Sequence, residues 1–265
     1  MGQSASQAGP SLQGICWPAA VARPVGCCLF TNPSPHVPDL DTYSQAEQLA
    51  TGAVPTWDSP DIDSNAWRPF KLLPTARVRI RNLSGLTGAI NAQVTFSTSA
   101  LTVGLGLQRV TRGIQVVSLA PAGQLELTFD LPAIDHPLGL FVDIAHPYDP
   151  RLINNHGARQ VFELSTRSEG RSIPLLIPVV NQSSNPTSIS VVALPTDLNV
   201  SITWPSSFGG SFAPLEQVDP TITIGVPTYL HGTSTSPSRH DVSLVARRSD
   251  GSLVDGITFV VWVDD

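Results

Sequence analysis

Charged side chains are scarce in this chain, and their scarcity narrows the fold classes that it can adopt. Only 14% of the 265 residues are charged, against 41% hydrophobic, so Ser, Thr, Asn, Gln and backbone must cover much of the surface. Solvent-facing helices normally carry an ionic face, so this composition favours β-sheets and long turns. The 24 prolines and 20 glycines interrupt helices and mark turns, which excludes an all-α fold.

Basic clusters and long apolar runs are also missing. With 15 Lys and Arg and a formal charge of −6, the chain lacks the positive footprint that attracts nucleic acid. No run reaches the roughly 18 apolar residues that a membrane span requires. The start, Met1 to Ser6, is not a standard secretory signal, although Gly2 with Ser6 fits the N-myristoylation pattern, and lipidation of Gly2 stays open.

The three cysteines, Cys16, Cys27 and Cys28, all lie near the N-terminus. Domains further along the chain therefore cannot contain the inter-sheet disulfide of antibody domains. An odd, vicinal set slightly favours a reducing compartment, or a particle assembled there, over a secreted disulfide framework. A disulfide between Cys16 and one of the vicinal pair stays open, and the compartment is not determined.

Residues 1–55 lack sustained periodicity and contain many prolines, so we expect an irregular N-terminal arm. One segment, Asp39–Ala50, has apolar residues at a spacing typical of a short helix. Asp39 or Asp41 would serve as its N-cap.

Short β-type runs begin at residue 76 and are separated by turn residues. The first alternates Val78 and Ile80 on one face with three arginines on the other, which we interpret as a solvated sheet face: Arg77, Arg79 and Arg81. Five further runs follow: Ala89–Ser97, Leu101–Leu107, Gly113–Leu119, Gln124–Leu131 and Gly139–Ile144. This density predicts an immunoglobulin-like sandwich over 56–150.

The prolines and turn residues of His146–Arg151 predict a domain boundary. Beyond it, a second series of runs predicts another sandwich over 151–265: Gln160–Thr166, Ser172–Asn181, Thr187–Leu194, Val200–Trp204, Thr221–Val226, His240–Arg247 and Ile257–Val263. The predicted fold class is therefore all-β, with two tandem immunoglobulin-like antiparallel sandwiches behind the irregular arm.

Four segments carry a family resemblance. Trp57–Ile62, with its Ser-Pro-Asp-Ile sequence, precedes Arg77–Asn82, a first strand that ends in Asn; Pro121–Gly123 then forms a turn before Thr128–Asp130. In these features the chain resembles the CARDB-type modules, cell-adhesion-related immunoglobulin-like domains of bacteria. Residues 63–75 depart from the pattern and leave the position of the first strand open. The resemblance implies spacers, assembly components or partner-binding appendages, and it supplies no catalytic residues.

Motifs for chemistry are absent. There is no Gly-x-Ser-x-Gly nucleophile elbow, and the glutamates are scattered. Three histidines recur every tenth residue and are interpreted as independent surface residues: His136, His146 and His156. An acidic segment resembles part of a calcium loop but lacks its Gly and its final Glu: Asp58, Asp61, Asp63 and Asn65. We expect no catalytic, cofactor or metal residues, and no enzyme.

The predicted function is a non-catalytic binding or scaffolding module, with a protein partner or self-assembly. Four aromatic residues are candidates for partner contact: Phe208, Phe212, Trp57 and Trp67. A capsid or virus-like shell subunit, in which one larger jelly roll replaces two sandwiches, is one alternative. A carbohydrate-binding module is the other, with stacking faces among Trp57, Trp67, Trp204 and Trp262.

Overall fold

The computed structural model describes most of the chain after residue 35. The described residues are 36–64, 75–101, 103, 109–131, 138–166, 172–227 and 238–263. The cysteines, Trp67, Asn65, His136 and most of the predicted strand Leu101–Leu107 lie outside them. Within them, the single helix has seven residues, so none is long and apolar enough to cross a membrane.

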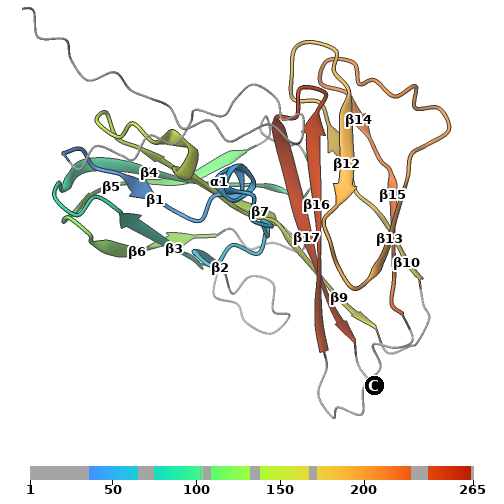
Figure 1. The fold of residues 1–265 in the computed structure, drawn as a ribbon, viewed down its shortest axis with the longest axis horizontal. Helices are drawn as coiled ribbons and strands as arrows, with labels where there is room; N and C mark the ends of the chain where they lie inside the picture. The colour runs from blue at the N-terminus through green and yellow to red at the C-terminus, as the bar shows by residue number, and fades with distance from the viewer. Residues whose placement is uncertain are drawn as a thin grey trace, which may run out of the picture.

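The first sandwich consists of two sheets (Figure 1). In the β3 sheet, β3 lies between β6 on one edge and both β1 and β2 on the other. The β4 sheet has the order β5-β4-β7-β8. The bounds are β1 Leu40–Asp41, β2 Ile62–Ser64, β3 Thr75–Asn82, β4 Ala89–Ala100, β5 Val110–Leu119, β6 Gln124–Asp130, β7 Leu138–Ala145 and β8 His156–Arg159.

The second sandwich also has two main sheets. The β15 sheet has the order β10-β15-β13, the β16 sheet has the order β12-β16-β17-β9, and β11 pairs separately with β14. The bounds are β9 Val161–Thr166, β10 Ser172–Leu176, β11 Val179–Val180, β12 Ile189–Ala193, β13 Asn199–Thr203, β14 Gln217–Val218, β15 Thr221–Gly225, β16 Ser238–Arg248 and β17 Leu253–Val263. The pairing of β9 with β17 is parallel, which the prediction of antiparallel sandwiches did not include.

Each sandwich has its own hydrophobic core, built by the alternation of strand side chains. In the first, Val78 and Ile80 are fully buried, and Phe96 stacks on Phe129 with ring centroids 4.9 Å apart. In the second, inward residues of the two sheets meet around Phe259. The predicted all-β fold of tandem sandwiches is confirmed, whereas a single jelly roll would enclose one core.

The segment predicted as irregular is ordered into the first sandwich from residue 36 onward. Leu40 is fully buried, and β1 pairs with the end of β3. A helix is present, but α1 spans Gln45–Thr51 and Ser44 is its N-cap, so the predicted caps at Asp39 and Asp41 were wrong. The reason is that pairing with β3 keeps Leu40–Asp41 extended, so the helix begins only after this strand.

The crossover between sandwiches lies later than the predicted boundary between residues 150 and 151. The 3₁₀ turn η2 (Leu152–Asn154) is followed by β8, which pairs with β7 and so belongs to the first sandwich. The chain leaves the first sandwich at Gln160, and β9 then joins the second sandwich. The turn residues near 150 therefore mark a hairpin within the first sandwich.

Candidate functional site

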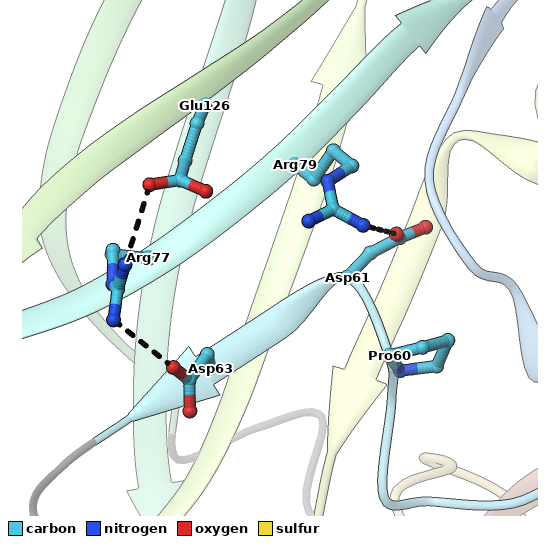
Figure 2. A pocket seen from close by; sticks show the side chains of 6 residues that line it. All are labelled: Pro60, Asp61, Asp63, Arg77, Arg79 and Glu126. Carbon is cyan, nitrogen blue, oxygen red and sulfur yellow. Dashed lines mark hydrogen bonds and ion pairs between the residues drawn. The ribbon is translucent and has the colours of Figure 1, made fainter.

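The outer face of β3 carries the three arginines found in the sequence. Figure 2 shows Arg77 between Asp63 and Glu126, at N···O distances of 3.4 and 3.7 Å, beside Arg79, which lies 3.8 Å from Asp61. These groups line a shallow hollow of about 120 Å³. Side chains as exposed as Arg77 gain little from such pairs. The face is a balanced array of opposite charges with no excess of positive charge for an anion.

The third arginine is more deeply placed. Arg81 contacts both oxygens of Asp61, at 2.5 and 2.7 Å, and donates to Asp41 at 3.1 Å. Asp61 also accepts the Tyr43 backbone N–H, and its side chain is 1% exposed. Burial raises the pKa of Asp41 to about 6. Asp61, part of the calcium-like segment, thus forms a bidentate ion pair that connects the residues before β2 and the Tyr43 backbone to β3.

The junction between the sandwiches is centred on Trp57, whose side chain is 1% exposed. Its ring packs among Phe141 and Ala158 of the first sandwich and Val245 of the second. Figure 1 shows β7 of the first sandwich approaching β16 and β17 of the second in this region. A tryptophan taken from the sequence as a partner contact is therefore enclosed within the chain.

Hydrogen bonds fix Trp57 to the second sandwich and to the crossover. Its backbone N–H donates to Thr258 Oγ1 at 2.8 Å, and its indole Nε1 donates to Asp255 at 3.2 Å. Its carbonyl accepts the Gln160 N–H, and the Gln160 side chain donates to the Gly256 carbonyl. A Cβ at Gly256 would overlap the indole ring, so glycine is required for this close approach.

Asp255 is the buried ionisable group of this junction. One of its oxygens accepts from both the indole and the Gly256 N–H. Burial is the main cause that raises the pKa of its carboxyl, opposed by these hydrogen bonds and by the charge of Arg109. Arg109 itself lies over the Phe141 ring, 3.8 Å from its centroid. The junction therefore favours a neutral carboxyl more than water does.

Two further contacts join the sandwiches. Asp58 forms ion pairs with Arg159 of β8 at 3.0 Å and with Arg239 of β16 at 2.7 Å. Val103, between β4 and β5, is fully buried in the core of the second sandwich and hydrogen-bonds with the β11 segment. Apolar burial, hydrogen bonds and ion pairs therefore act together across the junction.

The predicted aromatic contacts of the second sandwich form one cluster. Phe212 is fully buried in the core, while Phe208 is half-buried and stacks on Trp204 with centroids 4.8 Å apart. Phe208 also contacts Phe212 at 4.8 Å. Phe208 lines a hollow of about 310 Å³ with Ser and acidic side chains. Of these two phenylalanines, Phe208 is the one with accessible surface.

The histidines and carboxylates do not assemble into a metal centre within the described residues, where no group of three or more suitable side chains comes together. His146 contacts the Ile90 carbonyl at 3.1 Å, and His156 contacts Asp143 at 2.7 Å. These two histidines therefore have separate partners.

Sequence reasoning did not identify the junction as a unit. Trp57 was noticed, but its partners lie about 100 residues away at Phe141 and Ala158 and about 200 away at Asp255 and Thr258. The one local signal was Gly256 inside an apolar strand, which often marks a close approach of another group.

No family model matches the chain, and no curated protein matches it. Among solved structures, a protein of unknown function from Porphyromonas gingivalis aligns at 14% identity and TM-score 0.27, covering 76% of this chain and 99% of that one. Red sea bream transglutaminase aligns at 13% identity and TM-score 0.26, covering 82% of this chain and 33% of that one. The calcium-binding domain CBD12 of CALX1.1 aligns at 10% identity and TM-score 0.24, covering 66% of this chain and 74% of that one. These TM-scores are too low to relate the chain to any of the three.

Proposed function

We propose that this chain is a non-catalytic scaffolding and binding module that holds two immunoglobulin-like sandwiches in one fixed orientation for a protein partner. This role agrees with the spacers and assembly components implied by the resemblance to CARDB-type modules. The observation that carries the proposal is the burial of Trp57 between the sandwiches.

The junction has the properties of a rigid connection. Contacts between domains of one chain are often polar and permit relative motion, unless they are apolar and well packed. Here an enclosed indole, a neighbouring hydrogen-bond network and the inserted Val103 all resist separation of the two sandwiches. A connection of this kind suits a spacer, because it keeps the two sandwiches in one relative orientation.

The charged groups support a non-catalytic role. A catalytic acid or base needs an accessible position beside a bound substrate. Three buried or partly buried carboxylates contact arginines or the indole: Asp61 binds Arg81, Asp58 binds two arginines, and Asp255 binds Trp57. These contacts serve to connect strands and sandwiches.

Residual dipolar couplings of the full chain test the fixed orientation. In the proposed spacer, one alignment tensor fits the amides of both sandwiches, and Trp57→Ala requires two tensors. Trp204→Ala is the matched control, because it removes a half-buried tryptophan of the second sandwich outside the junction. Two independent tensors in the unaltered chain would contradict the proposal.

A further inference from the structure

Three polar side chains meet at the start of β16 in the second sandwich. Ser238 and His240 are two residues apart on this strand, so they lie on the same face, and Ser238 Oγ is 2.9 Å from His240 Nε2. On the other side of the ring, His240 Nδ1 is 2.8 Å from Asp197 Oδ2, which belongs to the connection between β12 and β13. A hydroxyl, an imidazole and a carboxylate thus form a continuous chain of hydrogen bonds.

Ser238 and His240 lie on the inner face of β16, where the second core ends. Val242 follows at the same two-residue spacing and is fully buried in that core, whereas the residues between them, Arg239 and Asp241, are exposed. The His240 side chain is 11% exposed, and Ser238 is partly exposed. The imidazole is therefore largely shielded from water, while the hydroxyl beside it can be reached from solvent.

The connection that carries Asp197 is anchored on both sides of this residue. Before it, Thr196 Oγ1 donates to the Asp241 carbonyl of β16 at 3.0 Å. After it, Leu198 is buried in the second core. The backbone around Asp197 is therefore fixed against the strand that carries His240, although the Asp197 side chain itself is 49% exposed.

The carboxylate determines which ring nitrogen carries the proton. A carboxylate only accepts hydrogen bonds, so His240 Nδ1 is the donor to Asp197. In the neutral ring Nε2 is then an acceptor, and the Ser238 hydroxyl donates to it. Among the described histidines, His240 is the one that contacts both a carboxylate and a hydroxyl. A hydroxyl that donates to a neutral imidazole can pass its proton to the ring while its oxygen forms a new bond.

We propose that Ser238 is a nucleophilic serine that accepts an acyl group from an activated ester, with His240 as its general base and Asp197 as a positioning residue. The Ser238 oxygen forms a bond to the carbonyl carbon of the ester, and its proton moves to His240 Nε2. The bond between that carbon and the leaving oxygen breaks, and the leaving group takes the proton from His240. The products are an acyl ester on Ser238 and a free alcohol, and nothing is oxidised or reduced.

This acylation goes beyond the scaffolding role and leaves that role in place. One acylation per chain needs a nucleophile and a base, which Ser238 and His240 supply. Rapid turnover would also need hydrogen-bond donors for the oxyanion of the intermediate. The proposal is therefore a site of covalent modification, at which a molecule that carries an acyl group becomes attached to the second sandwich.

Acetylation of the full-length chain by p-nitrophenyl acetate tests the proposal. Release of p-nitrophenol and the intact mass follow the reaction, and peptide mapping locates the acetyl group. We expect Ser238 to be acetylated at least about 100-fold faster than Ser201, an exposed serine of β13 in the same sandwich. Ser238→Ala should remove this fast reaction, and Ser201→Ala, the matched control, should leave it unchanged.

Variants of the other two residues test their roles, with circular dichroism to show that each variant is folded. His240→Gln keeps a polar side chain without a base and should lower the rate of Ser238 acetylation about 100-fold. Asp197→Asn should lower the rate and shift the nitrogen-15 signals of His240 toward the other tautomer, whereas Asp197→Glu, which retains the carboxylate, should restore both. Acetylation of Ser238 no faster than that of Ser201, or a rate that His240→Gln leaves unchanged, would overturn the proposal. One alignment tensor for both sandwiches would still support the scaffolding role in that case.

Discussion

Replacing Trp57 by alanine should uncouple the two sandwiches. The substitution removes the ring that fills the junction and the indole N–H that donates to Asp255. It leaves the cores of both sandwiches in place, because Trp57 belongs to neither. We therefore expect both sandwiches to stay folded and the contact between them to weaken.

The size of the effect follows from burial. An enclosed tryptophan removes roughly 200 Å² from water. At about 25 cal/mol per Å² this corresponds to about 5 kcal/mol. Large-to-small replacements of buried aromatic residues cost about 3–5 kcal/mol. We expect a loss of about 4 kcal/mol in the free energy of unfolding, a large share of the roughly 5–15 kcal/mol that stabilises a typical folded protein.

Urea unfolding followed by far-ultraviolet circular dichroism measures this loss. Because the junction couples the sandwiches, we expect the unaltered chain to unfold in one cooperative transition and Trp57→Ala to unfold in two. Trp204→Ala should lower the stability of the second sandwich without separating the transitions. A loss below about 1 kcal/mol for Trp57→Ala, within the range of surface substitutions, would refute the reasoning.

Three further substitutions test neighbouring features. Gly256→Ala should lower the stability by about 3 kcal/mol in thermal unfolding, because its Cβ overlaps the indole ring, whereas Gly85→Ala, with nothing within 4 Å, should not. Burial raises the pKa of Asp255 above 3.8, so the stability from its bound proton is complete below pH 3.8 and is lost as the pH rises through the folded pKa. The urea midpoint of the unaltered chain should therefore fall from acidic to neutral pH, and Asp255→Asn should make this fall smaller. An equally steep fall in the variant would count against burial of Asp255 as its cause. Arg81→Leu leaves the buried Asp61 without its bidentate partner, with Arg79 at 3.8 Å as the remaining cation, and should cost about 3 kcal/mol in urea unfolding; a loss below about 1 kcal/mol would disagree.

The all-β class and most strands could be predicted from the sequence, because strand alternation is a local property. Val78 and Ile80 alternate with arginines, and their burial follows directly from the two-residue period. The position of α1 and the boundary near residue 150 were placed less well. Each depended on a pairing with a distant strand, β1 with β3 in one case and β8 with β7 in the other.

Composition and periodicity by themselves determined that this chain forms β-sandwiches that carry few charges. The reason is that each residue type has its own local preference for a strand, a turn or the solvent-exposed surface. Only the tertiary structure decided what Trp57 does. An exposed aromatic residue and a buried one have the same sequence neighbours, and the difference arises from Phe141, Val245 and Asp255, which folding brings to it. The junction is a product of sheet packing, which depends on side chains that are remote along the chain.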